Sequence, residues 1–142
     1  MDLLTVLVVD DEEDFLETIV KRLQKRKIDA HGAKSGEEAL EIFQKVPVDV
    51  VILDVKMPGG IDGIETLREI KRLKPLTEII LLTGHASVET GIEGMKLGAF
   101  DYLLKPVKLE DLLPRLLQAF EKKGTQDRKI RNARIKEALK NP

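Results

Sequence analysis

Three short aliphatic runs restrict the fold of this chain more than any other feature. Val6–Val9, Val48–Leu53 and Ile79–Leu82 are rich in leucine and β-branched residues, and they are continuous rather than alternating. Such runs are typical of strands that are buried on both faces of a parallel sheet. Weaker patterns predict two further strands, around residues 28–32 and 101–104.

Apolar stripes with helical spacing separate these predicted strands. The stripes are Phe15, Ile19 and Leu23; Ala39, Leu40 and Phe43; Ile64, Leu67, Ile70 and Leu73; Val88, Ile92 and Met95; and Leu109, Leu112, Leu113, Leu116 and Phe120. A strand followed by a helix therefore occurs five times. This alternation predicts an α/β fold in which helices cover both faces of a parallel sheet.

Local signals predict where several helices begin and end. Ser35 is a candidate N-cap, and Pro75, Gly98 and Gly124 are expected to end the third, fourth and fifth helices. Pro114 falls about five residues into the last helix, where it has no N–H to donate. We expect either a kink at this proline or a later start of the regular helix.

Composition excludes several classes of protein. Hydrophobic residues make up 42% of the 142 residues, which is enough for a folded core. Cysteine is absent, so disulfides and thiolate metal sites are excluded. The N-terminus lacks a basic signal-peptide region, and no apolar run is long enough to span a membrane. We expect a cytoplasmic protein that does not bind membranes.

Charge divides the chain into two parts. Residues 121–142 contain eight Lys/Arg and three Asp/Glu, whereas residues 1–120 have a net charge of −6. We therefore predict a domain over residues 1–123 and a basic, helical tail or linker over 124–142. For the tail, a solvated charged face, a linker or dimerisation helix, and nucleic-acid contact are all open. Nucleic-acid contact is the least expected, since the tail lacks aromatic residues and a helix-turn-helix companion.

Polar residues end the predicted strands. Asp10 and Asp11 follow the first strand, Asp54 the third, Thr83 the fourth and Lys105 the fifth. Ligands of open α/β sheets bind outside the carboxyl ends of the strands, so these side chains are expected to meet at one edge. Each of them taken singly is more often a helix cap or a turn residue, and the argument rests on their convergence.

Clustered carboxylates repel one another, and a hard cation would explain their grouping. Magnesium prefers oxygen ligands and is commonly held by one or two carboxylates together with phosphate oxygens. Zinc is disfavoured, because the chain has no cysteine and only two histidines. A carboxylate neutralised in this way can attack a phosphoryl group, with a lysine and a hydroxyl holding the phosphoryl oxygens. We therefore predict a Mg²⁺-dependent phosphoacceptor, with Asp54 as the acceptor.

The motifs resemble the receiver domain of two-component response regulators over residues 3–122. The resemblance rests on Val8-Val9-Asp10-Asp11-Glu12, Leu53-Asp54-Val55-Lys56-Met57-Pro58, Thr83-Gly84-His85-Ala86 and Gly98-Ala99-Phe100-Asp101-Tyr102-Leu103-Leu104-Lys105-Pro106. It implies a flavodoxin-like (βα)5 fold with strand order 2-1-3-4-5 and a cis Lys105-Pro106 bond.

The resemblance also implies roles for single residues. Asp54 is similar to the phosphorylated aspartate, Asp10 and Asp11 to the acidic pair that holds Mg²⁺, and the backbone carbonyl of Lys56 to a further metal ligand. Thr83 and Lys105 match the residues that contact the phosphoryl group, and Thr83 and Tyr102 match the switch pair.

Partners follow from the same resemblance. The implied phosphodonor is a sensor histidine kinase or a phosphotransfer protein. Phosphorylation is expected to change the surface formed by the fourth helix, the fifth strand and the fifth helix, for a downstream protein, a missing output domain or a second copy of the chain. The protein is expected to act as a signalling switch that catalyses only its own phosphorylation and dephosphorylation.

One departure from the family pattern lies beside Asp54. The segment Gly59-Gly60-Ile61 contains one residue more than the family usually has before Asp62-Gly63. We expect phosphorylation to survive, with altered metal affinity and phosphoryl lifetime. Position alone also suggests that Lys56 or His85 tunes this lifetime, although residues at such positions are more often ordinary solvent-exposed loop residues.

Three other functions compete with the switch. A phosphohydrolase of the haloacid dehalogenase type would need a second acid two residues after Asp54, where Lys56 stands. A dinucleotide-binding module would need a glycine-rich first turn, and the chain has Asp10-Asp11-Glu12-Glu13 there. A piece of a longer transcription factor would have this same sequence.

Overall fold

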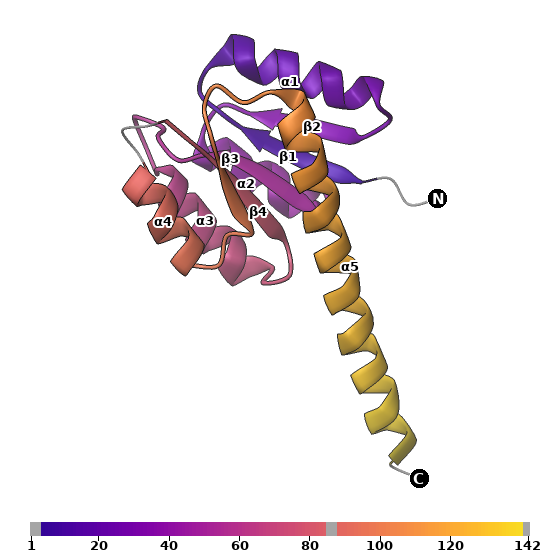
Figure 1. The fold of residues 1–142 in the computed structure, drawn as a ribbon. Helices are drawn as coiled ribbons and strands as arrows, with labels where there is room; N and C mark the ends of the chain where they lie inside the picture. The colour runs from indigo at the N-terminus through magenta and orange to yellow at the C-terminus, as the bar shows by residue number, and fades with distance from the viewer. Residues whose placement is uncertain (1–3, 85–87, 141–142) are drawn as a thin grey trace.

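The computed structural model describes residues 4–84 and 88–140 (Figure 1). Its elements alternate without exception along these residues. They are β1 (Thr5–Val9), α1 (Glu13–Lys25), β2 (Asp29–Ala33), α2 (Gly36–Lys45), β3 (Val50–Asp54), α3 (Gly63–Leu73), β4 (Glu78–Thr83), α4 (Val88–Lys96), β5 (Asp101–Leu104) and α5 (Leu109–Lys140). All neighbouring strands are parallel, and their order is β2-β1-β3-β4-β5. The predicted α/β class and the flavodoxin-like strand order are therefore confirmed.

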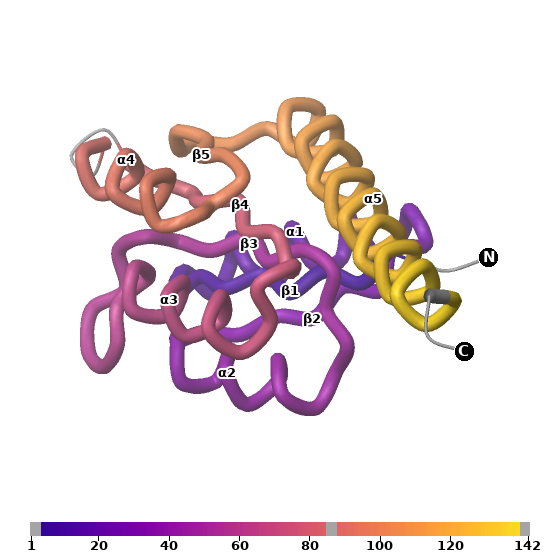
Figure 2. Tube along the Cα trace, turned by 90° about the horizontal axis from the view of Figure 1, so that it is seen from below, coloured from indigo at the N-terminus to yellow at the C-terminus, as the bar shows by residue number. Residues whose placement is uncertain are grey.

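Helices cover both faces of the sheet, as the uninterrupted apolar strands require (Figure 2). Alternate residues of one strand point to opposite faces. Leu7, Val9, Val51 and Leu53 pack with α2 and α3 on one face. Val6, Val8, Val50 and Ile52 pack with α1 and α5 on the other. Because both faces are dry, polar side chains gather at the two ends of the strands.

The predicted helix signals near α2 and α4 are present in the structure. The Ser35 hydroxyl accepts a hydrogen bond from the backbone N–H of Glu38 at 3.1 Å, which is the expected N-cap. Gly98 follows α4 with a φ of +107°, a backbone conformation that favours glycine. α3 ends at Leu73, just before Lys74 and Pro75. These local signals fix how each helix enters and leaves the sheet.

The expected end of the last helix at Gly124 is wrong, and so is one of the two alternatives for Pro114. α5 continues through Gly124 to Lys140, so Gly124 does not end it. Glycine weakens a helix interior by about 1 kcal/mol relative to alanine, which neighbouring contacts can offset. Here Lys123 lies 3.0 Å from Asp127 and 3.7 Å from Asp49, and the Thr125 hydroxyl donates to the Glu121 carbonyl. The later start is wrong too, because the helix begins at Leu109 and contains Pro114.

The second half of α5 leaves the body of the protein (Figure 1). Side chains from Arg128 to Leu139 are exposed. They include Ile130, Ile135 and Leu139, which give the basic tail a sparse apolar content. Among residues 4–84 and 88–140, no helix is both long enough and apolar enough to cross a membrane.

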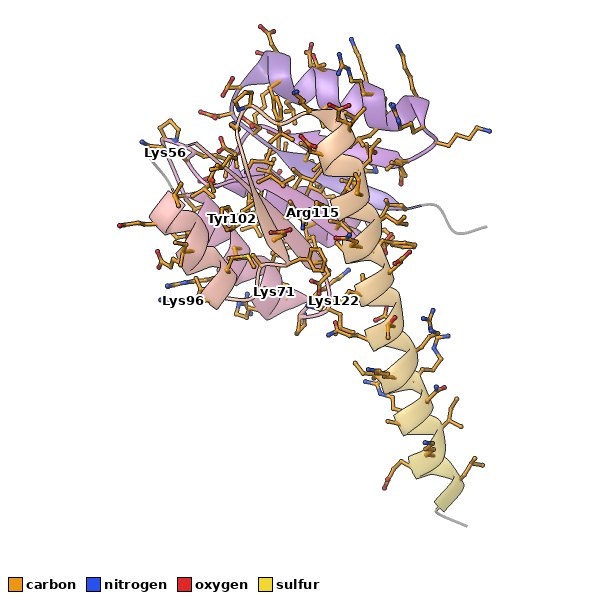
Figure 3. All side chains as sticks on the ribbon, viewed as in Figure 1. Lys56, Lys71, Lys96, Tyr102, Arg115 and Lys122 are labelled. Carbon is orange, nitrogen blue, oxygen red and sulfur yellow. The ribbon has the colours of Figure 1, made fainter. Side chains whose placement is uncertain are left out.

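A buried carboxylate joins two helices at the end of the sheet where β4 begins. Glu78 is buried, and its carboxylate lies 3.9 Å from the Lys71 ammonium of α3 and 3.4 Å from that of Lys122 in α5. The two lysines are labelled in Figure 3. Burial lowers the pKa of Lys71, although the charge of Glu78 opposes that shift. Lys71 also donates to the backbone carbonyls of Pro75 and Thr77. These contacts hold α3 and α5 to the same strand from opposite faces.

Substitution by alanine is expected to have opposite effects on stability at Gly124 and at Gly98. A Cβ at Gly124 would meet Arg128 at 3.8 Å, an ordinary contact, so Gly124→Ala should stabilise the helix by about 0.5–1 kcal/mol. Gly98→Ala should destabilise the protein by about 1 kcal/mol or more, because its φ is +107°. Amide exchange across residues 121–131 and urea unfolding measure the two effects. Faster exchange in Gly124→Ala would contradict the prediction.

Candidate functional site

The carboxyl ends of the central strands bring the predicted site residues together. Asp10 directly follows β1, and its N–H donates to the Ala33 carbonyl of β2 at 3.1 Å. Asp54 and Thr83 are the last residues of β3 and β4. Lys105 follows β5, and its N–H donates to the Thr83 carbonyl at 2.8 Å. The parallel register therefore places all four residues at one edge of the sheet.

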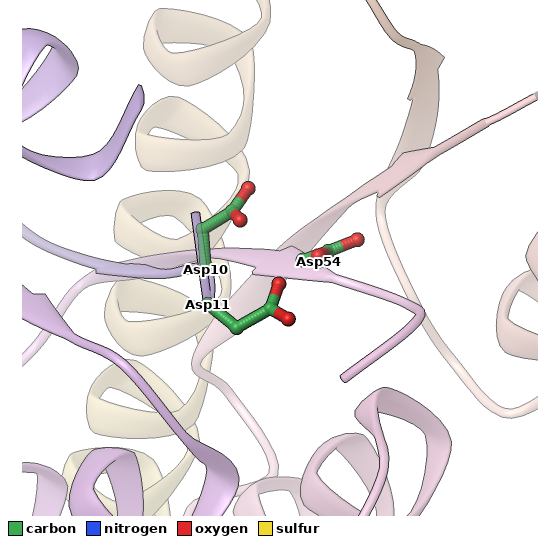
Figure 4. A group of neighbouring side chains, drawn as sticks. All are labelled: Asp10, Asp11 and Asp54. Atoms are coloured by element: carbon green, nitrogen blue, oxygen red, sulfur yellow. The ribbon is translucent and has the colours of Figure 1, made fainter. Parts of the chain in front are cut away.

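Three carboxylates form the centre of this edge (Figure 4). Asp10, Asp11 and Asp54 each offer an oxygen, and these oxygens lie within 4.8 Å of one another. Asp10 is fully buried and Asp54 is 5% exposed, whereas Asp11 faces solvent. Backbone N–H groups partly satisfy the buried pair, since that of Glu12 donates to Asp10 at 2.9 Å and that of Lys56 to Asp54 at 3.3 Å.

Lys105 is the cation of the cluster. Its ammonium lies 2.8 Å from Asp10, 3.5 Å from Asp54 and 3.4 Å from Glu12. It also lies 5.2 Å from the centre of the Phe15 ring, a distance that suits a cation–π contact. Burial lowers the pKa of the Lys105 ammonium, but the hydrogen bond to Asp10 and the nearby negative charges outweigh burial and raise it above 10.5. Lys105 is therefore charged at neutral pH, and its peptide bond to Pro106 is cis, as predicted.

Burial also changes the pKa of Asp54, the predicted phosphoacceptor. It raises the pKa of the Asp54 carboxyl from 3.8 to about 6, and the neighbouring charge of Asp10 acts in the same direction. Lys105 and the Lys56 N–H oppose this shift. Two buried carboxylates and one exposed carboxylate, balanced by one ammonium, leave an excess of negative charge. A divalent cation with oxygen ligands would neutralise that excess, so the donor set fits Mg²⁺. The Lys56 carbonyl as a further ligand stays a prediction.

Thr83 has an unusual environment for a hydroxyl. The residue is fully buried, and its Oγ1 has no hydrogen-bond partner within residues 4–84 and 88–140. A buried polar atom without a partner costs about 1–3 kcal/mol. An oxygen-rich group bound at the adjacent Asp54 would supply the missing partner. Tyr102, the other predicted switch residue, is half-buried and packs against the core.

A cavity of about 710 Å³ opens over the carboxylates. Predicted residues that line it are Asp11, Asp54, Lys56 and Lys105. Asp62 and Thr90 also line it, and sequence reasoning did not identify either. Asp62 is the N-cap of α3 and accepts a hydrogen bond from the Glu65 N–H at 2.8 Å. An N-cap pattern in the sequence does not indicate that the residue also lines a cavity. His85, one of the two suggested tuning residues, lies outside the described residues.

The loop with the extra residue turns toward α2. Gly59 and Gly60 have φ values of +77° and +104°, which favour glycine. The Ile61 N–H then donates to the Glu37 carboxylate of α2 at 3.1 Å. A Cβ at Gly60 would collide with that carboxylate, and one at Gly36 would lie 2.6 Å from the Ile61 side chain. The loop therefore packs on the start of α2, and residues 59–61 do not line the cavity.

Comparison with known proteins places this arrangement among relatives. The family model described as response regulator receiver domain matches residues 6–117. Regulatory protein AtoC of Escherichia coli is 37% identical over 107 residues, which are 75% of this chain and 23% of AtoC. A putative NtrX-like response regulator of Rickettsia bellii is 38% identical over 122 residues, which are 85% of this chain and 26% of that protein. The chain thus spans about a quarter of the length of these curated relatives.

Solved structures agree with these matches. The crystal structure of a response regulator receiver domain protein from Clostridium thermocellum is 40% identical, with a TM-score of 0.83. The match covers 87% of this chain and 99% of that one. NtrX from Brucella abortus, crystallised with ADP, is 27% identical with a TM-score of 0.84, over 89% of this chain and 29% of NtrX.

Removing the Asp54 charge should stabilise the metal-free protein at high pH. Since the folded pKa is above 3.8, the folded state binds more protons than the unfolded chain, and stability falls as pH rises through about 6. Asp54→Asn should therefore raise the free energy of unfolding by about 1–3 kcal/mol at pH 8. The gain should shrink as the pH falls from 6 towards 4.

Urea unfolding from pH 5 to pH 8 with a metal chelator measures this effect, and Asp11→Asn is the matched control. Asp11 is exposed, so its change should be much smaller. Added Mg²⁺ should stabilise the parent protein and reduce the advantage of Asp54→Asn. A parent protein as stable at pH 8 as at pH 5, together with no gain in the variant, would refute the prediction.

Glu37 is expected to hold the loop beside the cavity. Glu37→Ala removes the acceptor of the Ile61 N–H, so exchange of that amide should speed up by about 2- to 10-fold. Glu37→Gln keeps an acceptor oxygen and should have an intermediate effect. Glu38→Ala, in the same helical turn, is the control, because the Glu38 carboxylate accepts from Lys34 instead. Equal Ile61 exchange in all four proteins would show that Glu37 does not hold the loop.

Proposed function

This chain belongs to the response regulator receiver domain family of two-component signalling, and we propose that it is a phosphorylation-controlled switch in which Asp54 accepts the phosphoryl group. The observation that supports this most is the surroundings of Asp54. Its buried carboxylate lies close to the Lys105 ammonium and to two further carboxylates. The neighbouring strand ends in Thr83, whose buried hydroxyl has no partner among the described residues. A bound phosphoryl group with a divalent cation would satisfy all of them.

The transfer we propose is a single displacement. An oxygen of the Asp54 carboxylate attacks the phosphorus of a phosphohistidine, the bond between phosphorus and the histidine nitrogen breaks, and that nitrogen keeps the electron pair. A sensor histidine kinase or a phosphotransfer protein would supply the phosphohistidine. Attack needs the ionised carboxylate, and a divalent cation bound beside Asp54 would favour that form.

The metal we propose is Mg²⁺. Asp10, Asp11 and Asp54 would hold it, together with the backbone carbonyl of Lys56. When bound, Mg²⁺ supplies positive charge that offsets the negative charge of the carboxylates and of the phosphoryl oxygens. Lys105, already held by Asp10 at 2.8 Å, donates to a second phosphoryl oxygen. The Thr83 hydroxyl donates to a third.

The proposed output begins at Thr83. As its hydroxyl moves toward the phosphoryl group, the Tyr102 ring fills the space that Thr83 leaves, and the surface of α4, β5 and α5 changes. Large apolar side chains are exposed on these three elements, namely Ile92 and Met95, Leu104, and Leu117. That surface suits a downstream protein, an output domain or a second copy of the chain.

The division of the chain also belongs to the proposal. Residues 1–123 form the receiver and residues 124–142 a linker that continues α5 toward a further domain. Support comes from the curated relatives, which are more than three times as long as this chain. The protein would act in the cytoplasm, without contact of this segment to membrane or nucleic acid. Lys56, exposed at the cavity, would tune the lifetime of the phosphoryl group.

Incubation with acetyl phosphate and Mg²⁺, followed by intact mass measurement, tests the function. We expect the mass of one added phosphoryl group, no addition in Asp54→Asn, and little addition when the metal is chelated. Lys105→Arg keeps the charge but not the compact ammonium, and should slow the reaction without abolishing it. The decay of the product in Lys56→Ala, compared with the parent, tests the tuning role.

Two outcomes would overturn the proposal. Rapid turnover of donor without accumulated phosphoprotein would indicate a phosphohydrolase. No reaction in the parent, despite Mg²⁺ binding, would indicate a receiver domain that has lost the transfer.

A further inference from the structure

Gly91 of α4 occupies a position between the two predicted switch residues. It is one of two buried glycines in this nine-residue helix. A Cβ built on Gly91 would lie 3.0 Å from the Thr83 methyl carbon and 3.6 Å from two atoms of the Tyr102 ring. The Cα hydrogens of Gly91 therefore face the place where the two side chains meet.

Helix stability does not explain this glycine, since glycine in a helix interior is less stable than alanine. Its φ lies outside the range that favours glycine, so the backbone does not require it either. Gly94 has a different neighbour, because a Cβ there would collide with the Leu81 side chain. What distinguishes Gly91 is therefore its contact with Thr83 and Tyr102.

The Thr83 side chain has a reason to move. Its hydroxyl is buried without a partner in the described part of the chain, while its methyl group faces Gly91. A new acceptor on Asp54 would draw the hydroxyl away from α4. The space beside Gly91 would then be open to the neighbouring Tyr102 ring, which is half-buried and labelled in Figure 3.

We propose that Gly91 is a positioning residue for the switch: the lack of a side chain at this position leaves the space through which Thr83 and Tyr102 move together. A methyl group there would occupy that space. It would press on Thr83 in the resting state and would keep the ring out after Thr83 has moved. This inference rests on the proposed function, because it presupposes that Thr83 responds to a group on Asp54.

The test uses Gly91→Ala with Mg²⁺ and beryllium fluoride as the phosphoryl mimic. Fluorine NMR reports binding of the mimic, and proton NMR of the ring reports Tyr102, which is the only tyrosine of the chain. We expect Gly91→Ala to bind the mimic at the same or a lower concentration than the parent. With the mimic bound, the Tyr102 ring either fills the space beside Gly91 (inward) or stays out of it (outward). The ratio of inward to outward positions should be lower in Gly91→Ala than in the parent by about fivefold or more, as expected when one methyl overfills a packed site.

Two further variants separate positioning from a general disturbance of α4. Gly94→Ala also adds a methyl on the buried face of α4, but against Leu81, and should keep the ring response. In Thr83→Ser/Gly91→Ala the threonine methyl is gone while the hydroxyl stays, so the ring response should recover relative to Gly91→Ala. Thr83→Ser alone is its reference. If Gly91→Ala alone does not fold, the comparison of Thr83→Ser with Thr83→Ser/Gly91→Ala still tests the role of Gly91.

Other outcomes would contradict either the proposed function or the role of Gly91. If the parent does not bind the mimic, the proposed function fails. If the parent binds it and its ring responds, but Gly91→Ala gives the same ring response, the role of Gly91 is refuted. It is also refuted if Gly94→Ala abolishes the ring response equally, or if the serine substitution gives no recovery.

Discussion

The carboxylates of Asp10 and Asp54 are both buried, and the Lys105 ammonium contacts both of them. A buried pair of like charges is unfavourable unless a cation lies between them. Here the cation comes from the strand at the edge of the sheet and the acids from two inner strands, so β1, β3 and β5 must keep their relative positions. The electrostatic balance of the site and the register of the sheet therefore depend on each other.

The parallel register also explains how much the sequence could predict. Strand ends coincide at one edge whenever strands are parallel, so Asp10, Asp54, Thr83 and Lys105 could be brought together without coordinates. Each residue directly follows a predicted strand, so its place at a strand end is a local signal, although its role depends on the convergence of all four. The cap at Ser35 and the turn at Gly98 were predictable for the same reason: a short stretch of sequence determines each one.

Features that depend on contacts between distant segments could not be predicted in this way. Gly124 resembles a helix stop, yet it lies inside a continuous helix in which the preceding Lys123 contacts Asp49, far away in sequence. The path of the Gly59–Ile61 loop depends on Glu37, and the place of Thr90 at the cavity depends on how α4 packs. Likewise, nothing around Gly91 in the sequence indicates that it touches Thr83 and Tyr102.

The length of α5 has a mechanical consequence. A straight helix of 32 residues is about 48 Å long, and the exposed part from Arg128 to Leu139 accounts for about 18 Å of it. Its first half is held by the sheet and by the Lys122 contact to buried Glu78, which acts as a fulcrum. A tilt of about 10° at that point would displace the far end by about 4–5 Å, as simple geometry on this rise per residue gives. The exposed end of α5 would thus move further than the part that packs on the sheet. A rigid helix can transmit such a movement without further contacts along its length.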